Sequence, residues 1–169
     1  MSNPNFHTPT AWFEAARLIM GSIDLDPATD HVAARGMQPA RWYTPQEDGL
    51  TLPWPGNVFI NPPGGKVWQK WAGKANTELR AGRAKQLFWL GFNADQLRAF
   101  HLSEKWIFPG KELVLAIPRK RIAFTHPQTL EKMKNPEHSN YILMVLNPEN
   151  VECSRLQLGP VCEMYRPLV

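Results

Sequence analysis

The segment from Ala84 to Phe92, AKQLFWLGF, is an almost continuous apolar run. A strand with one wet face alternates apolar and polar residues, whereas an unbroken run is typical of a strand covered on both faces. Such a strand needs a layer of other elements on each side of its sheet. The run therefore favours an α/β fold with helices on the faces of a mostly parallel sheet.

The rest of the chain alternates between helical and strand-like patterns. A helix is predicted over residues 10–21, where Thr8 or Thr10 can cap the first turn and Gly21 can end it. A second helix is predicted over 66–82. The other expected elements are strands at 22–27, 58–61, 105–110, 112–118, 121–124, 140–147 and 161–169, a helix at 93–102 and an irregular stretch at 29–57. Because the C-terminal part is rich in strands, antiparallel strands are expected at that side of the sheet.

Size and charge set broad limits. The 169 residues suit one domain, 1–169, and the formal net charge of +4 fits a polyanionic partner without requiring one. Cys153 and Cys162 have no partner residues at a metal-binding spacing, so no metal is expected. No apolar run approaches the ~20 residues of a membrane span, so a cytoplasmic location without membrane contact is expected.

The sequence NVFINPPGGK ends a strand-like run with Asn61-Pro62-Pro63. Two prolines stop a strand and fix the backbone, so a simple turn is one interpretation. The other is chemical, because the exocyclic amine of a nucleobase is a weak nucleophile whose lone pair is delocalised into the ring. Two acceptors, the Asn61 side-chain oxygen and the Pro62 carbonyl, can bind its two N–H groups and expose that lone pair.

Three elements occur in order along the chain: HTPTAWFEAARLIMG with IDLDPA, then EDGLTLPWPGNVFI, then NPP. This order resembles the S-adenosylmethionine-dependent DNA adenine-N6 methyltransferases, and more closely the small enzymes of phages and prophages. The resemblance covers most of the chain. It implies a compact Rossmann-like fold, DNA as the partner, and action in the cytoplasm of a host cell.

The resemblance also implies roles for individual residues. It assigns Thr8, Pro9, Asp26, Pro27 and Asp48 to the cofactor, and Asn61, Pro62 and Pro63 to catalysis. The chain departs from the family at Gly64, where an aromatic residue usually stacks on the extruded base. It also lacks the Gly-rich cofactor loop, and Asp30 is the candidate for the ribose hydroxyls.

Other residues are expected to bind the substrate. These are Phe92, Trp42, Arg119, Lys120 and Arg121, with Trp89 as a weaker candidate than Phe92 for stacking on the base. Lys66, Lys70 and Lys74 form a stripe on the predicted helix, which is either a solvated face or a DNA contact.

The sequence thus predicts a methyltransferase that modifies adenine N6 in DNA. One alternative keeps the chemistry but changes the target to cytosine N4 or an RNA base. Another is a nucleic-acid-binding protein of the same fold without transfer activity, which Gly64 keeps open. A third is an enzyme that adds a larger group to the same amine, in the space left by the missing aromatic residue.

Overall fold

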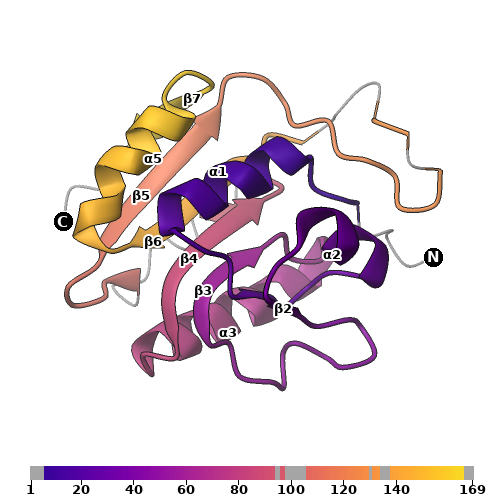
Figure 1. The fold of residues 1–169 in the computed structure, drawn as a ribbon, viewed down its shortest axis with the longest axis horizontal. Helices are drawn as coiled ribbons and strands as arrows, with labels where there is room; N and C mark the ends of the chain where they lie inside the picture. Colours follow the sequence, from indigo (N-terminus) through magenta and orange to yellow (C-terminus); the bar gives the residue numbers. More distant parts are fainter. Residues whose placement is uncertain (1–5, 94–95, 98–105, 130, 134–137, 166–169) are drawn as a thin grey trace.

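The computed structural model describes residues 6–93, 96–97, 106–129, 131–133 and 138–165. Its named strands join one seven-stranded sheet in the order β2-β1-β3-β4-β6-β5-β7 (Figure 1). The strands are β1 (Leu25–Asp26), β2 (Arg41–Trp42), β3 (Gly56–Ile60), β4 (Ala84–Gly91), β5 (Glu112–Pro118), β6 (Tyr141–Leu146) and β7 (Cys162–Tyr165). The helices are α1 (Thr10–Met20), α2 (His31–Met37), α3 (Trp68–Arg80) and α5 (Val151–Leu158), with short 3-10 turns at Gly65–Val67 and Pro148–Asn150.

The sheet has a parallel half and an antiparallel half. β2, β1, β3 and β4 run parallel, whereas β6, β5 and β7 each pair antiparallel with their neighbours. The predicted α/β fold, Rossmann-like with antiparallel strands toward the C-terminus, is confirmed. Because β4, β6 and β5 alternate in direction, the carboxyl end of β5 lies at the same edge of the sheet as those of β1, β3 and β4.

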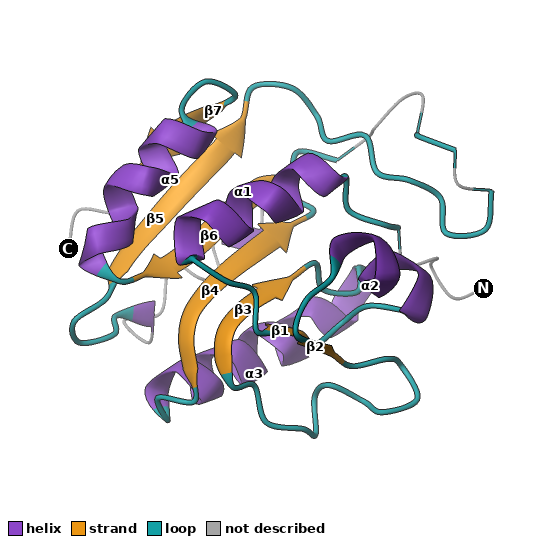
Figure 2. Ribbon diagram, viewed as in Figure 1, coloured by secondary structure: helices purple, strands orange, loops and turns teal. Residues whose placement is uncertain are grey.

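Helices cover the two faces of the sheet unequally (Figure 2). Residues of α1, α2 and α5 form one core cluster with one face of the sheet, including Phe13 and Met37. Residues of α3 form the other cluster with the opposite face, including Trp71 and Leu79. A three-layer arrangement follows from the apolar content of the strands, which must be shielded on both sides.

β4 shows this two-sided burial most clearly. Phe88 and Leu90 belong to the cluster under α1, whereas Leu87 and Trp89 belong to the cluster over α3, and all four are fully buried. Alternate residues of a strand point to opposite faces, so β4 is covered on both faces from Gln86 to Gly91, and Lys85 near its start is exposed. The prediction made from the apolar run is confirmed.

α1 begins and ends almost where the sequence predicts. Gly21 follows it with φ 85°, a left-handed conformation that glycine adopts without steric cost, and its N–H donates to the Arg17 carbonyl. The predicted cap is wrong, because Pro9 occupies the N-cap position and no described side chain hydrogen-bonds to the first turn. Proline has no N–H group, so Pro9 leaves no donor of its own without a partner at this position.

Several other expectations need correction. The stretch 29–57 is not irregular throughout, since it contains α2 and β2. Described residues 106–110 and 121–124 form no strand, and in the second segment Ile122 and Phe124 are buried from a loop. Most of the helix predicted at 93–102 lies outside the described residues.

Candidate active site

A cavity of about 450 Å³ lies at the carboxyl ends of β1, β3 and β4. Asp26 ends β1, Asn61 directly follows β3 and Phe92 directly follows β4, and all three line the cavity. In α/β sheets, ligands bind beyond the carboxyl ends of the parallel strands. The volume lies within the range of small-molecule sites, roughly 300–1,000 Å³.

The Asn61 side chain is held by a hydrogen bond from its nitrogen, and its oxygen has no partner among the described residues. Its Nδ2 donates to the Phe6 carbonyl at 3.2 Å. A carbonyl can only accept, so this contact places the amide nitrogen toward Phe6 and the Oδ1 on the other side. Asn61 Oδ1 is buried and has no hydrogen-bond partner among the described residues. A buried, unsatisfied acceptor at a cavity is an available position for a ligand N–H group.

The two prolines after Asn61 also line the cavity, with Pro62 buried. Neither has an N–H group that could compete for the acceptors there, and each has a fixed φ. The site thus presents acceptors from a rigid backbone at the end of β3. The Pro62 carbonyl remains the predicted second acceptor beside Asn61.

Asp26 is a buried carboxyl group in the cavity wall, with 2% of its surface exposed. Its Oδ1 accepts the Ala28 N–H at 3.1 Å. Burial, together with the nearby charge of Asp30, raises its pKa to about 7, and the hydrogen bond from Ala28 only partly opposes this. Asp26 is therefore partly protonated near neutral pH and would ionise beside a cationic ligand.

Asp30 is a second carboxylate in the cavity wall, in a contrasting environment. It caps α2 by accepting the N–H groups of Val32 at 2.8 Å and Ala33 at 2.9 Å. It also lies 2.7 Å from His7 Nε2. Burial opposes ionisation, but the hydrogen bonds from Ala33 and His7 hold the pKa of Asp30 below its usual value. At neutral pH the cavity therefore contains one ionised carboxylate, Asp30, and one partly protonated carboxyl group, Asp26.

Two aromatic side chains line the other end of the cavity. Phe92 is half-buried and packs against Phe124, with ring centroids 5.6 Å apart, and against His138 at 5.7 Å. Trp68, the first residue of α3, is also half-buried there. Trp89, the weaker stacking candidate, is fully buried in the core and does not line the cavity.

Sequence reasoning missed Trp68 and His7. Trp68 lies four residues beyond Gly64. The signal that could have indicated its role is the start of the predicted helix just after the Asn-Pro-Pro motif. His7 is one residue before the predicted Thr8, and only the fold brings it to Asp30.

Several predicted residues lie outside the cavity lining. Pro9 caps α1, Pro27 follows the buried end of β1, and Trp42 is half-buried on edge strand β2. Asp48 is exposed and its Oδ1 accepts the Leu50 N–H at 3.1 Å, which closes a tight turn. Of the five predicted cofactor residues, Thr8 and Asp26 line the cavity.

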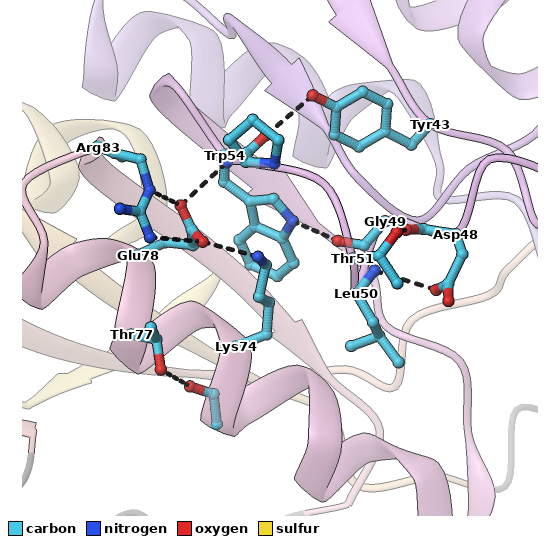
Figure 3. Close-up of polar contacts among 12 residues, drawn as sticks. Tyr43, Asp48, Gly49, Leu50, Thr51, Trp54, Lys74, Thr77, Glu78 and Arg83 are labelled. Carbon is cyan, nitrogen blue, oxygen red and sulfur yellow. Dashed lines mark hydrogen bonds and ion pairs between the residues drawn. The ribbon is translucent and has the colours of Figure 1, made fainter.

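The loop that carries Asp48 is held by a buried polar network (Figure 3). Glu78 of α3 accepts the Trp54 N–H at 3.1 Å and pairs with Lys74 at 2.7 Å and Arg83 at 2.6 Å. Trp54 Nε1 donates to the Gly49 carbonyl at 2.7 Å. Although burial opposes it, hydrogen bonds from Arg83, Lys74 and Trp54 lower the pKa of Glu78 to about 2. The Lys74 ammonium group therefore stabilises the fold through its ion pair with Glu78.

The remaining basic candidates are exposed. Lys66 and Lys70 lie on either side of Trp68 in sequence, and of these three residues Trp68 lines the cavity. Arg119 to Arg121 follow β5, three strand positions from β3 and on the same sheet edge, roughly 14 Å away. Arg119 pairs with Glu163 at 2.8 Å. Among the residues that the structure describes, no helix is long and apolar enough to cross a membrane.

Comparisons with known proteins were made by sequence and by structure. No protein-family model matches the chain, and no curated protein sequence matches it. Among solved structures, the chain is similar to a crystal structure from Pyrococcus horikoshii described as a "putative RNA methyltransferase". The TM-score is 0.43 at 12% identity, over 84% of this chain and 91% of that one. So distant a likeness identifies neither a family nor an activity, and the assignment depends on the site.

Proposed function

We propose that this protein is an S-adenosylmethionine-dependent methyltransferase that modifies the N6 amine of adenine in DNA. One observation carries the proposal above the others. Asn61 presents a buried acceptor without a described partner, at the wall of a cavity and next to two prolines. The motif order along the sequence supports the same conclusion independently.

The unpaired oxygen suits an amine better than most other groups. An exocyclic amine has two N–H bonds and a delocalised lone pair. Asn61 Oδ1 accepts one N–H and the Pro62 carbonyl accepts the other, which draws the nitrogen toward tetrahedral geometry and exposes its lone pair. The Phe6 carbonyl holds the Asn61 amide in place before the substrate arrives. A preorganised acceptor of this kind costs no reorganisation during the reaction.

The other end of the cavity fits the cofactor. S-adenosylmethionine carries a cationic ammonium group and ribose hydroxyls, and when bound it supplies an electrophilic methyl group. Asp26 offers a buried carboxyl group that ionises beside a cation, and Asp30 offers an ionised carboxylate for hydroxyl donors. Met37 and Ala33 of α2 add an apolar wall.

Trp68 and Phe92 take the place of the aromatic residue that is missing at position 64. A base must leave the duplex stack to reach Asn61, at a cost of a few kcal/mol. Stacking on an aromatic ring returns about 1–3 kcal/mol. Both rings line the same cavity as Asn61, so either can contact a base whose amine reaches the Asn61 oxygen. Phosphate contacts at this edge of the sheet come from four exposed residues, Lys66, Lys70, Lys120 and Arg121.

The test is incubation of the protein with unmethylated DNA and labelled S-adenosylmethionine, followed by nucleoside mass spectrometry. The expected product is N6-methyladenine, and Asn61→Ala is expected to abolish it while cofactor affinity, measured by calorimetry, stays nearly unchanged. Label in N4-methylcytosine would reassign the target base. Absence of any labelled nucleoside with DNA or RNA, from a folded protein that binds the cofactor, would overturn the proposed activity.

A further inference from the structure

The segment before α1 crosses the cavity and contacts both of its ends. We define the N-terminal strap as Phe6, His7 and Thr8, all of which line the cavity. In Figure 1 the indigo segment before α1 runs toward α2 and toward the orange loop that follows β5. Thr8 is buried, whereas Phe6 and His7 are half-buried.

Three contacts fix His7. Its N–H donates to the Thr125 carbonyl at 2.9 Å, and the Thr125 N–H donates to the His7 carbonyl at 3.0 Å. Its side chain lies 2.7 Å from Asp30, through Nε2. Asp30 is itself fixed as the cap of α2. The strap is thus hydrogen-bonded to the loop after β5 on one side and to the N-cap of α2 on the other.

The Phe6 carbonyl is the point at which the strap meets the candidate catalytic residue. It accepts Asn61 Nδ2 at 3.2 Å. Phe6 and His7 are adjacent, so any movement of His7 moves this carbonyl. An asparagine amide that loses its Phe6 contact can rotate and exchange the places of its nitrogen and oxygen, because both ends have nearly the same shape.

From these contacts we propose that His7, held by Asp30, is a positioning residue that keeps Asn61 Oδ1 directed at the substrate amine. The inference rests on the proposed function for its kinetic consequence, but not for its structural one. The hydrogen bond between His7 and Asp30 connects the cofactor end of the cavity, at Asp30, to the amine-binding end, at Asn61. Binding of the cofactor at the Asp30 end is thereby linked to the orientation of the Asn61 amide at the other end.

The structural consequence can be measured without turnover. The Asn61 side-chain NH₂ resonances are identified by their loss in Asn61→Ala, and their exchange with water is followed by NMR. In His7→Ala this exchange is expected to accelerate about fivefold, the effect of losing one net hydrogen bond. His7→Gln keeps a nitrogen that can donate to Asp30 and is expected to restore slow exchange. Should His7→Ala fail to fold, His7→Asn keeps a polar group but is too short to contact Asp30.

The kinetic consequence separates positioning from general destabilisation. In His7→Ala, kcat is expected to fall by about tenfold to a hundredfold with a smaller change in KM, because a misplaced group loses transition-state contacts. The control is Glu14→Ala, which removes a 2.7 Å ion pair with Arg17 on α1, and neither of these two residues lines the cavity. It is expected to leave kcat unchanged.

Two results would overturn the role of His7. One is unchanged exchange of the Asn61 amide in both His7→Ala and His7→Asn. The other is a fall in kcat that Glu14→Ala reproduces or that His7→Gln does not relieve. Lack of methylation by the wild-type protein would contradict the proposed function instead, and the NMR result would still decide whether His7 positions Asn61.

Discussion

Gly49 and Pro27 lie so close that a Cβ on Gly49 would sit 2.1 Å from the Pro27 carbonyl oxygen. Only glycine allows the loop to approach the end of β1 in this way. Trp54 holds the Gly49 carbonyl, and Glu78 holds the Trp54 backbone. The EDGL sequence thus acts in this structure as packing for the strand end that carries Asp26, while its predicted direct contact with the cofactor stays a prediction.

Gly49→Ala is expected to displace the loop or the end of β1, since a Cβ and a carbonyl oxygen cannot approach to 2.1 Å. Overpacking of this kind costs about 1–3 kcal/mol or more. Cofactor affinity should fall as well, because Asp26 adjoins Pro27. Thermal melting and calorimetry measure both effects. The matched control is Gly73→Ala in α3, where a Cβ meets nothing within 4 Å and helix stability should rise by roughly 1 kcal/mol. Equal melting temperatures for the two variants would contradict the close-packing argument.

The buried carboxyl of Asp26 predicts a pH-dependent stability. Its pKa rises from 3.8 in the unfolded chain to about 7 in the folded one. The folded state therefore binds the proton more tightly, and the stability that this contributes is complete below about pH 4 and is lost as the pH rises toward 7. The full loss is on the order of 4 kcal/mol.

Asp26→Asn should remove this dependence. Urea titrations at pH 4 and pH 8 are expected to show a variant that is similar to wild type at pH 4 and more stable at pH 8. Cofactor affinity should change in the opposite direction, because the amide carries no charge for an ammonium group. A variant that is less stable than wild type at pH 8 would show that the Asp26 carboxylate stabilises the fold.

How far the sequence predicts this protein can be seen at particular residues. The apolar run of β4 and the Asn-Pro-Pro motif depend on local pattern, and both lead to the correct sheet and to the cavity wall. The hydrogen bond between His7 and Asp30 joins residues 23 positions apart, and no local pattern encodes it. Trp68 has the same apolar periodicity as a core residue, so only the fold separates it from Trp71, which is buried.

The lysine stripe on α3 also shows that the sequence pattern does not separate a lysine that stabilises the fold from an exposed one. Lys74 pairs with buried Glu78, whereas Lys70 is exposed. Lys74→Ala is expected to cost about 1–3 kcal/mol of stability, because it removes a charged partner from a buried carboxylate. Lys70→Ala should stay within about 0.5 kcal/mol of wild type but weaken DNA binding and lower its salt dependence. Filter binding at two salt concentrations, with melting curves, tests the pair. A larger DNA-binding loss in Lys74→Ala at unchanged stability would return Lys74 to the DNA interface.

The missing aromatic residue at Gly64 gives the last prediction, because Trp68 and Phe92 both line the cavity but differ in packing. Phe92 contacts fully packed Phe124, so Phe92→Ala is expected to lower stability by about 2–4 kcal/mol. Trp68 packs against the other core cluster and starts α3 after the short 3-10 turn Gly65–Val67. It is expected to provide the stacking surface because it lies five residues after Pro63 and lines the same cavity. Its loss should therefore appear in binding as well as in stability.

The measurement is the affinity for a single-stranded oligonucleotide with one adenine, compared with the same strand carrying an abasic site. Wild type should prefer adenine by about tenfold, the value of one stacked base. Trp68→Ala should lose this preference, and Trp68→Phe should keep most of it, because phenylalanine retains an aromatic face. The control is Trp12→Ala, which truncates another half-buried tryptophan, on α1 outside the cavity. If Phe92→Ala loses the preference at unchanged melting temperature while Trp68→Ala keeps it, the base stacks on Phe92, as the sequence alone predicts.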